Sequence, residues 1–228
     1  MPPPDSRHDR AGTRDQRPVA AGTWSGAGRA ERSKRSAHDH ADTRLDESFL
    51  AHFLRAPAIV GGIVPSSRVL ARALSRHAAG FDAIVELGAG AGSVTRCLEA
   101  DHPRATLTVI ERSGSMARRL ARNWPRASVR AGCVHERAEC LLAQPPRTVA
   151  VSSLPFRSLP EDLAEATIAV LRRFLLAHPE RRLVQYSYGL REPFALGDPA
   201  LRWRRAERVW RNLPPAVVWV VVSAQARA

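Results

Sequence analysis

The chain has little sulfur and no cysteine framework. Three of its 228 residues are cysteine and two are methionine, and no two cysteines stand in a C-x-x-C pair. The sequence therefore predicts no disulfide framework, and an odd number of thiols is typical of a reducing cytosol. The first residues contain no apolar segment, so a secretory signal is not expected either.

Long hydrophobic runs and lysine are also scarce. The longest apolar run, 216–222, has the length of a strand and is far shorter than the ~20 residues that span a bilayer. Lysine occurs once, at Lys34, although the formal net charge is +13 at pH 7. The arginine excess attracts polyanions, so nucleic acid and an anionic membrane surface are both candidate partners. We expect a cytoplasmic protein, either free or peripheral on the inner face of the cell membrane.

Composition divides the chain into three parts. Residues 1–44 are rich in proline, glycine, serine and arginine and predict a disordered tail. Residues 45–80 predict an amphipathic helix with Phe49 and Phe53 on one face, then a turn and a second helix. The first helix either packs on the domain or lies at a membrane surface or over a site. Residues 81–228 predict the main domain.

Strands and helices alternate through the main domain. After a first strand near position 84, the pattern predicts helices at 93–100, 115–123, 135–142 and 161–177, and strands at 107–111, 127–132, 148–153 and 182–188. Two last strands, at 205–210 and 216–223, read as an antiparallel pair. The sequence therefore predicts an α/β fold, with a mostly parallel seven-stranded sheet that ends in an antiparallel hairpin and has helices on both faces.

A glycine-rich turn follows the first strand. Ile84 and Val85 suit a buried strand, and residues 86–92 read Glu-Leu-Gly-Ala-Gly-Ala-Gly. Glycine permits a positive φ and close approach of a ligand, and the helix that begins at Ser93 directs its first N–H groups toward that ligand. Glu111 ends the next strand, where a carboxylate can accept hydrogen bonds from a ribose.

The spacing of this turn favours S-adenosylmethionine over a dinucleotide. A dinucleotide-binding turn would have a third glycine at position 93, where this chain has Ser93. The sulfonium ligand has no pyrophosphate and does not need that close approach. An S-adenosylmethionine site indicates a methyltransferase.

Five segments together resemble a known family. They are Gly62–Ser67 (GIVPSS), Glu86–Gly92 (ELGAGAG), Ser152–Phe156 (SSLPF), Val184–Gly189 (VQYSYG) and Arg211–Trp219 (RNLPPAVVW). In these segments the chain resembles the bacterial phospholipid N-methyltransferases of the class I, Rossmann-like methyltransferase superfamily. The resemblance covers the chain from about Phe49 to Ser223. It implies S-adenosylmethionine as cofactor and N-methylation of a phospholipid amine, from phosphatidylethanolamine towards phosphatidylcholine.

The resemblance also implies a cofactor site. The glycines of the turn would contact the amino acid moiety, which Glu86 orients, and Glu111 would bind the ribose. Members of the superfamily commonly have an acid after the glycine of the third strand, and this acid binds the adenine amine. This chain has Cys133 there, so adenine would be held by backbone groups or by Glu136. The implied cofactor residues are Glu86, Leu87, Gly88, Ala89, Gly90, Gly92, Glu111, Arg112, Cys133 and Val134.

The acceptor site follows from the mechanism of methyl transfer. The methyl group of a sulfonium is already activated, so the protein chiefly has to position and desolvate a neutral amine. Ser153, Leu154 and Pro155 are candidates to orient the amine. Tyr186 and Tyr188, which alternation places on one face of a strand, are candidates for cation–π contact with a methylated ammonium or for packing. No metal is expected, because His135 and Glu139 fit the polar side of a surface helix better than a metal pair.

Two other functions remain open from the sequence. The rRNA adenine dimethyltransferases share the general plan but show N-[LIP]-P-[YF] where this chain has Ser153-Leu154-Pro155-Phe156, and the missing asparagine argues against a nucleic-acid substrate. A non-catalytic S-adenosylmethionine-binding protein is the third hypothesis. For a lipid substrate, Phe49, Phe53 and the arginines would supply contact with an anionic membrane surface. The sequence specifies no oligomeric state.

Overall fold

The computed structural model describes residues 68–212 and 214–224. The predicted tail at 1–44, the helix that carries Phe49 and Phe53, and the turn and helix start before Arg68 lie outside the described residues. All described residues belong to one compact unit of the chain.

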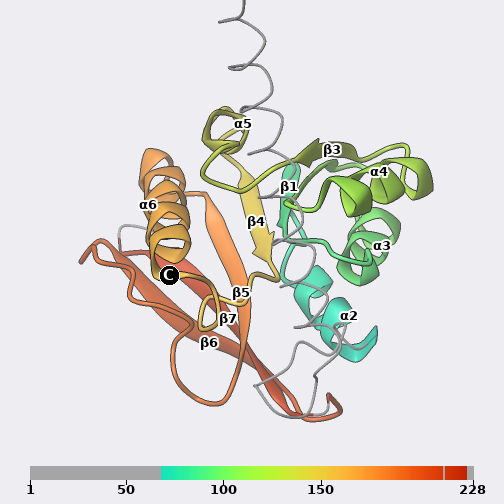
Figure 1. Cartoon of the computed structure of the whole chain (residues 1–228). Coiled ribbons are helices and arrows are strands. Elements are labelled where there is room, and N and C mark those ends of the chain that lie inside the picture. Colours follow the sequence, from blue (N-terminus) through green and yellow to red (C-terminus); the bar gives the residue numbers. More distant parts are fainter. Residues whose placement is uncertain (1–67, 213, 225–228) are drawn as a thin grey trace, which may run out of the picture. The chain divides into compact units, whose positions relative to one another are not determined.

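Seven strands form one sheet in the order β3-β2-β1-β4-β5-β7-β6 (Figure 1). The first five are parallel, whereas β7 runs antiparallel between β5 and β6. Their bounds are β1 Ala83–Leu87, β2 Thr106–Glu111, β3 Ser128–Ala131, β4 Thr148–Ser152, β5 Arg182–Tyr188, β6 Leu201–Val209 and β7 Ala216–Ser223. The predicted fold class is therefore confirmed.

The strand order changes direction between β1 and β4. From β1 the chain builds outward through β2 to β3, and it then returns to place β4 on the other side of β1. The carboxyl ends of β1 and β4 therefore flank a topological switch point, where open α/β sheets bind ligands. This point lies beside the glycine turn.

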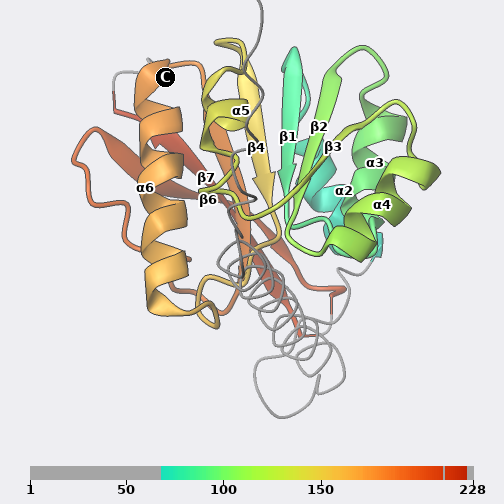
Figure 2. The same ribbon diagram turned by 45° about the horizontal axis from the view of Figure 1, so that its top comes forward.

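Helices cover both faces of the sheet (Figures 1 and 2). Consecutive strand residues point to opposite faces, so Ile84 belongs to one apolar cluster and Val85 to the other. The first cluster packs under α2, α3 and α4, and the second under α5 and α6. The bounds are α2 Arg68–Arg76, α3 Ser93–Asp101, α4 Gly114–Asn123, α5 Ala138–Leu142 and α6 Glu161–Ala177.

Two element boundaries differ from the prediction by more than one residue. The sequence predicts a strand from 205, whereas β6 already begins at Leu201. Leu201 and Trp203 are buried and alternate with exposed arginines, and the many arginines make this alternation hard to recognise in the sequence. The sequence predicts a helix from 135, whereas α5 begins at Ala138. The Glu136 carboxylate accepts a hydrogen bond from the Cys133 N–H at 2.8 Å and closes a turn ahead of the helix.

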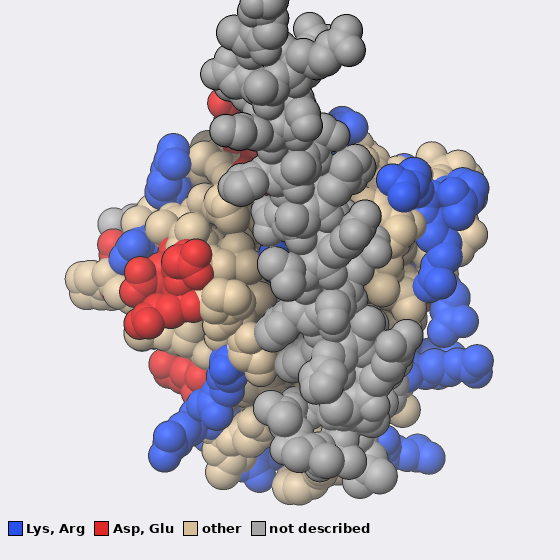
Figure 3. All heavy atoms as spheres, viewed as in Figure 1, with Lys and Arg blue, Asp and Glu red and all other residues tan. Residues whose placement is uncertain are grey.

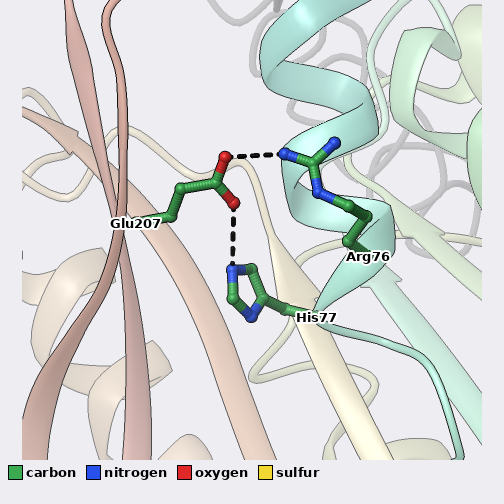
Figure 4. Close-up of polar contacts among 3 residues, drawn as sticks. All are labelled: Arg76, His77 and Glu207. Carbon is green, nitrogen blue, oxygen red and sulfur yellow. Dashed lines mark hydrogen bonds and ion pairs between the residues drawn. The ribbon is translucent and has the colours of Figure 1, made fainter.

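Polar contacts fix α2 against elements that are distant in sequence. Figure 4 shows Glu207 of β6 between two side chains at the end of α2. Its Oε1 lies 2.6 Å from Arg76 Nη2 and its Oε2 lies 3.3 Å from His77 Nε2. The helix is thereby held against the closing hairpin.

A serine, an aspartate and a histidine join α2 to the end of α3. The Ser75 hydroxyl donates to Asp101 Oδ2 at 2.7 Å, and His102 Nε2 lies 2.8 Å from the Ser75 carbonyl oxygen. Ser75 is fully buried, so no substrate reaches its hydroxyl. These three residues are a structural link and not a nucleophilic triad.

Arg181 ties the ends of two helices together. Its buried guanidinium donates to the carbonyl oxygens of Phe174 at 3.2 Å and Leu142 at 2.9 Å, and also to that of Gln144. It lies 4.6 Å from the centre of the Phe174 ring. The last carbonyls of a helix lack intrahelical partners and carry partial negative charge, so a cation stabilises them. The sequence gives no sign of this role.

Replacement of Arg181 tests this link. Arg181→Met keeps much of the apolar stem but leaves three carbonyl groups without their donor, and we expect a loss of about 2–4 kcal/mol in the free energy of unfolding. Arg173→Met, at an exposed position of α6, is the matched control and should change it by less than about 0.5 kcal/mol. Denaturant titrations give both values, and equal stabilities of the two variants would contradict the assigned role.

Candidate functional site

The glycine turn leaves β1 at the switch point and leads into α3. Gly88, Gly90 and Gly92 have φ angles of 73°, 53° and 83°, all in the left-handed region. The Gly88 N–H donates to the Ile110 carbonyl oxygen at 2.9 Å, which holds the turn against the end of β2. The backbone therefore reverses within a few residues and exposes the first turn of α3.

The three glycines differ in what surrounds them. A Cβ atom on Gly88 would lie 2.8 Å from Leu154 Cδ2, and one on Gly92 would lie 2.3 Å from the Trp124 ring. A Cβ on Gly90 would meet no atom within 4 Å. Gly88 and Gly92 are thus required by protein packing, whereas Gly90 faces open space that a ligand can occupy.

Glu111 stands at the end of β2 and faces this turn. Its Oε2 accepts from the Gly90 N–H at 2.8 Å, and its Oε1 accepts from the Ser113 N–H at 2.9 Å. The residue is only 5% exposed, so the two backbone bonds fix its orientation. A carboxylate oxygen has a second lone pair, and each can still accept a bond from a vicinal diol. The structure thus brings the predicted ribose ligand next to Gly90.

Glu86 is the most strongly perturbed acid among the described residues. It is 0% exposed, and neither carboxylate oxygen has a hydrogen-bond partner of normal geometry among the described residues. Burial raises the pKa of the Glu86 carboxyl to about 8; neighbouring polar groups of Thr95 oppose the rise, and the nearby Glu111 carboxylate adds to it. An ammonium group of a ligand would supply the missing partner and favour the charged form.

The pKa of Glu86 predicts how stability depends on pH. Because the pKa of about 8 in the folded state is above the ordinary value of 4.5, the folded protein favours the protonated acid. The contribution of Glu86 to the free energy of unfolding is then fully present below pH 4.5, and it is lost as the pH rises from there through 8. Glu86→Gln cannot titrate, so its advantage over the natural protein should grow across this interval to a few kcal/mol, at about 1.4 kcal/mol per pKa unit.

Urea unfolding at several pH values measures this difference. Glu161→Gln, at the exposed start of α6, removes one acid elsewhere and is the control. Parallel stability profiles for Glu86→Gln and the natural protein between pH 4.5 and 8 would show that burial does not raise the pKa of Glu86.

The loop after β3 is held by its own side chains. Gly132 has a φ of 135°, and the Arg137 Nε donates to the Ala131 carbonyl oxygen at 2.7 Å. The Cys133 N–H already donates to Glu136 Oε2, so a carboxylate does lie at this loop, although not at position 133 itself. Both predicted ways to hold adenine thus use groups that bond to each other in this structure, and the choice between them stays a prediction. Val134 is buried beneath the loop, and Arg112 is exposed.

A cavity of about 240 Å³ opens at the carboxyl ends of β4 and β5. Four predicted acceptor residues line it: Leu154, Pro155, Tyr186 and Tyr188. Ser153 does not; its Oγ is buried and has no partner among the described residues, while its N–H donates to the Leu87 carbonyl oxygen at 2.9 Å. Sequence reasoning did not anticipate the other lining residues, which are Phe156, Arg157, Ser158, Gln185, Ser187 and Pro193.

The two tyrosines lie side by side, as strand alternation predicts. Their ring centres are 5.6 Å apart and the rings are inclined by 74°. Burial raises the pKa of the Tyr188 hydroxyl, and interactions with Asn212 and Tyr186 oppose that rise. The hydroxyl therefore stays protonated near neutral pH, so the pair offers aromatic surface without negative charge.

Leu154 connects the glycine turn to this cavity. Its side chain packs on Gly88, and its carbonyl oxygen accepts from Gln185 Nε2 at 3.0 Å. A molecule in the cavity is thus separated from the turn by a single residue. Two ligands that react with each other could meet at Leu154.

The structure of residues 68–212 and 214–224 bears on metal binding and on membrane-spanning helices. In these ranges no group of three or more histidine, cysteine or acidic side chains is arranged to hold a metal ion. The helices described there are too short or too polar to cross a bilayer.

Comparison with solved structures identifies the fold. No protein-family model matches the chain, and no curated protein matches it. The 1,6-didemethyltoxoflavin-N1-methyltransferase of Burkholderia thailandensis, solved with bound 1,6-didemethyltoxoflavin and S-adenosylhomocysteine, is 15% identical with a TM-score of 0.55, over 82% of this chain and 89% of that one. A TehB-like S-adenosylmethionine-dependent methyltransferase from Corynebacterium glutamicum is 16% identical with a TM-score of 0.51, over 79% and 99%.

A third solved structure shows the same likeness. The mitomycin 7-O-methyltransferase MmcR is 19% identical with a TM-score of 0.50, over 79% of this chain and 59% of that one. The acceptors named for these proteins differ, so the likeness does not extend to one substrate. The chain has the Rossmann-like fold of class I S-adenosylmethionine-dependent methyltransferases.

Proposed function

We propose that the protein is an S-adenosylmethionine-dependent methyltransferase. The observation that carries the proposal is Glu86, a fully buried acid near the end of β1 whose carboxylate has no hydrogen-bond partner of normal geometry among the described residues. The glycine turn follows it directly, and Gly90 in that turn faces open space. A cation is the natural partner of such an acid, and S-adenosylmethionine carries an ammonium group on its amino acid end. The shared fold of solved methyltransferases supports the same cofactor.

The residues around the switch point fit this cofactor part by part. Glu86 would accept hydrogen bonds from the ammonium group, and Gly90 would let the ligand approach the backbone. The preoriented Glu111 would accept from both ribose hydroxyls. Glu136 would bind the adenine amine. When bound, the cofactor supplies a methyl group that is already activated by its positive sulfur.

The acceptor cavity suits an amine that must lose a proton before it attacks. An alkyl ammonium has a pKa near ~10 in water, and a partly apolar cavity lowers it because burial disfavours the charged form. The tyrosine pair lines that cavity. Its ring faces would attract a methylated ammonium by about 0.5–2 kcal/mol.

We infer further that the acceptor is the amine headgroup of a phospholipid. Arg157 lines the same cavity, is exposed, and has no acidic partner among the described residues. An arginine near an amine site fits a molecule that joins an amine to a phosphate. The volume of about 240 Å³ suits a headgroup, because cavities that enclose a drug-sized ligand measure ~300–1,000 Å³.

A single methyl group at Gly90 tests the cofactor site. Gly90→Ala would project a Cβ into the space assigned to the ligand, and we expect the Kd for S-adenosylmethionine to rise at least tenfold in calorimetry. Gly80→Ala is the matched control, since Gly80 also has a positive φ of 84° and open space but precedes β1, at its opposite end. Both variants carry a similar backbone strain of about 1–2 kcal/mol. Equal affinities of the two variants would place the cofactor elsewhere.

Arg157 tests the acceptor. With radiolabelled S-adenosylmethionine and phosphatidylethanolamine vesicles, the natural protein should produce methylated lipid. Arg157→Gln should raise the KM for the lipid severalfold because the phosphate loses its cation. Arg173→Gln, at an exposed position of α6 that does not line the cavity, should not. Cofactor binding without any lipid product would contradict the phospholipid proposal.

One observation favours nucleic acid as a second candidate substrate. Residues 112–135 contain no acid, and α4 and the edge strand β3 within them carry exposed arginines. Figure 3 shows basic side chains gathered on the side where α4 lies, with acidic ones on the opposite side. Among the described residues, α4 and β3 carry no exposed large apolar side chain that could enter a membrane. Their arginines could therefore bind the phosphate backbone of a nucleic acid as readily as a membrane surface. Labelled RNA, with no labelled lipid, would be the result that favours this candidate.

A further inference from the structure

Gln185 connects two segments that line the acceptor cavity. It stands on β5, is 2% exposed, and lines the cavity. Its Nε2 donates to the carbonyl oxygen of Leu154 at 3.0 Å and to that of Tyr186 at 2.9 Å. The side chain thus joins the loop after β4 to the strand that carries the tyrosine pair.

These two bonds decide which way the amide faces. Both partners are carbonyl oxygens, which only accept, so the NH₂ group has to face them and the amide oxygen has to face away. That oxygen, Oε1, is buried and has no hydrogen-bond partner among the described residues. A buried acceptor without a hydrogen bond lowers the free energy of unfolding by about 1–3 kcal/mol. A hydrogen-bond donor on a molecule in the cavity would remove this cost.

We propose that Gln185 Oε1 accepts a hydrogen bond from an N–H of the acceptor amine and so positions the nitrogen for attack. This inference rests on the proposed methyltransferase function and names a residue that the resemblance did not assign. The chemical requirement is a neutral nitrogen that still carries a hydrogen. Gln185 would thereby select for amines with at least one N–H.

The same contact strengthens as the reaction proceeds. The nitrogen lone pair forms the bond to the methyl carbon while the carbon–sulfur bond breaks and its electron pair stays on sulfur. Positive charge develops on the nitrogen, so its N–H becomes a better donor to Oε1. An interaction that is stronger in the transition state than in the ground state raises the rate. The proton leaves the ammonium product to water afterwards.

The contribution of Gln185 therefore depends on how many methyl groups the acceptor already has. At the moment of attack a primary amine has two N–H groups, a secondary amine has one, and a tertiary amine has none. Gln185 can assist the first and second transfers to one nitrogen. It cannot assist a third.

Three acceptors separate this role from a structural one. We would measure kcat/KM with phosphatidylethanolamine and its N-methyl and N,N-dimethyl derivatives in otherwise identical vesicles. Gln185→Met should lower kcat/KM for the first two acceptors tenfold or more relative to the third, because only they lose an N–H bond. Ser187→Ala is the matched control on the same strand. The Ser187 hydroxyl bonds only within the chain, to Arg191 and Trp219, so its loss should affect all three acceptors alike.

Gln185→Asn covers the case in which Gln185→Met does not fold. It keeps an amide but withdraws the oxygen by one carbon, and it should give the same dependence on the acceptor. Equal losses with all three acceptors, or no loss with any, would overturn the inference about Gln185. If the natural protein methylates none of the three although it binds the cofactor, the proposed phospholipid function fails instead.

Discussion

The parallel pairing of β1 with both β2 and β4 is the constraint on which the site depends. Leu87 at the end of β1 is in register with Ile110 on one side and Ser152 on the other. The chain can leave β1 only between these two ends, so the glycine turn emerges between Glu111 and the loop that begins after β4. The proposed cofactor residues and the proposed acceptor cavity meet for this reason at Gly88 and Leu154, which are 66 positions apart in the sequence.

Several of the buried polar atoms that lack a hydrogen-bond partner among the described residues lie around this point. Arg181 has three carbonyl partners at the far ends of α5 and α6. The Glu86 carboxylate oxygens and Gln185 Oε1 have none among the described residues. A folded protein tolerates such groups at a cost in stability, and their concentration at the switch point is what a site for polar ligands requires. The two ligands that would satisfy them are a cation and an N–H donor.

Local patterns predicted most of the architecture. Apolar strands and amphipathic helices have distinct periodicities, so the seven strands and the glycine turn could be recognised directly. The prediction was inaccurate where side chains from elsewhere intervene. Arginines on the exposed side of β6 conceal its start at Leu201, and the Glu136 carboxylate delays the start of α5. In the site, Ser153 does not line the cavity, while Arg157 and Gln185, to which the sequence assigned no role, do.

The sequence alone determined the fold class, the place of the glycine turn and the presence of an acid at the end of β2, because each is written in residues that are close along the chain. Only the tertiary structure decided which glycine faces a ligand, which acid lacks a partner and which way the Gln185 amide points. These properties depend on atoms from other strands and loops, such as Trp124 against Gly92 and the Leu154 carbonyl against Gln185. Contacts between such distant segments exist only once the sheet has formed.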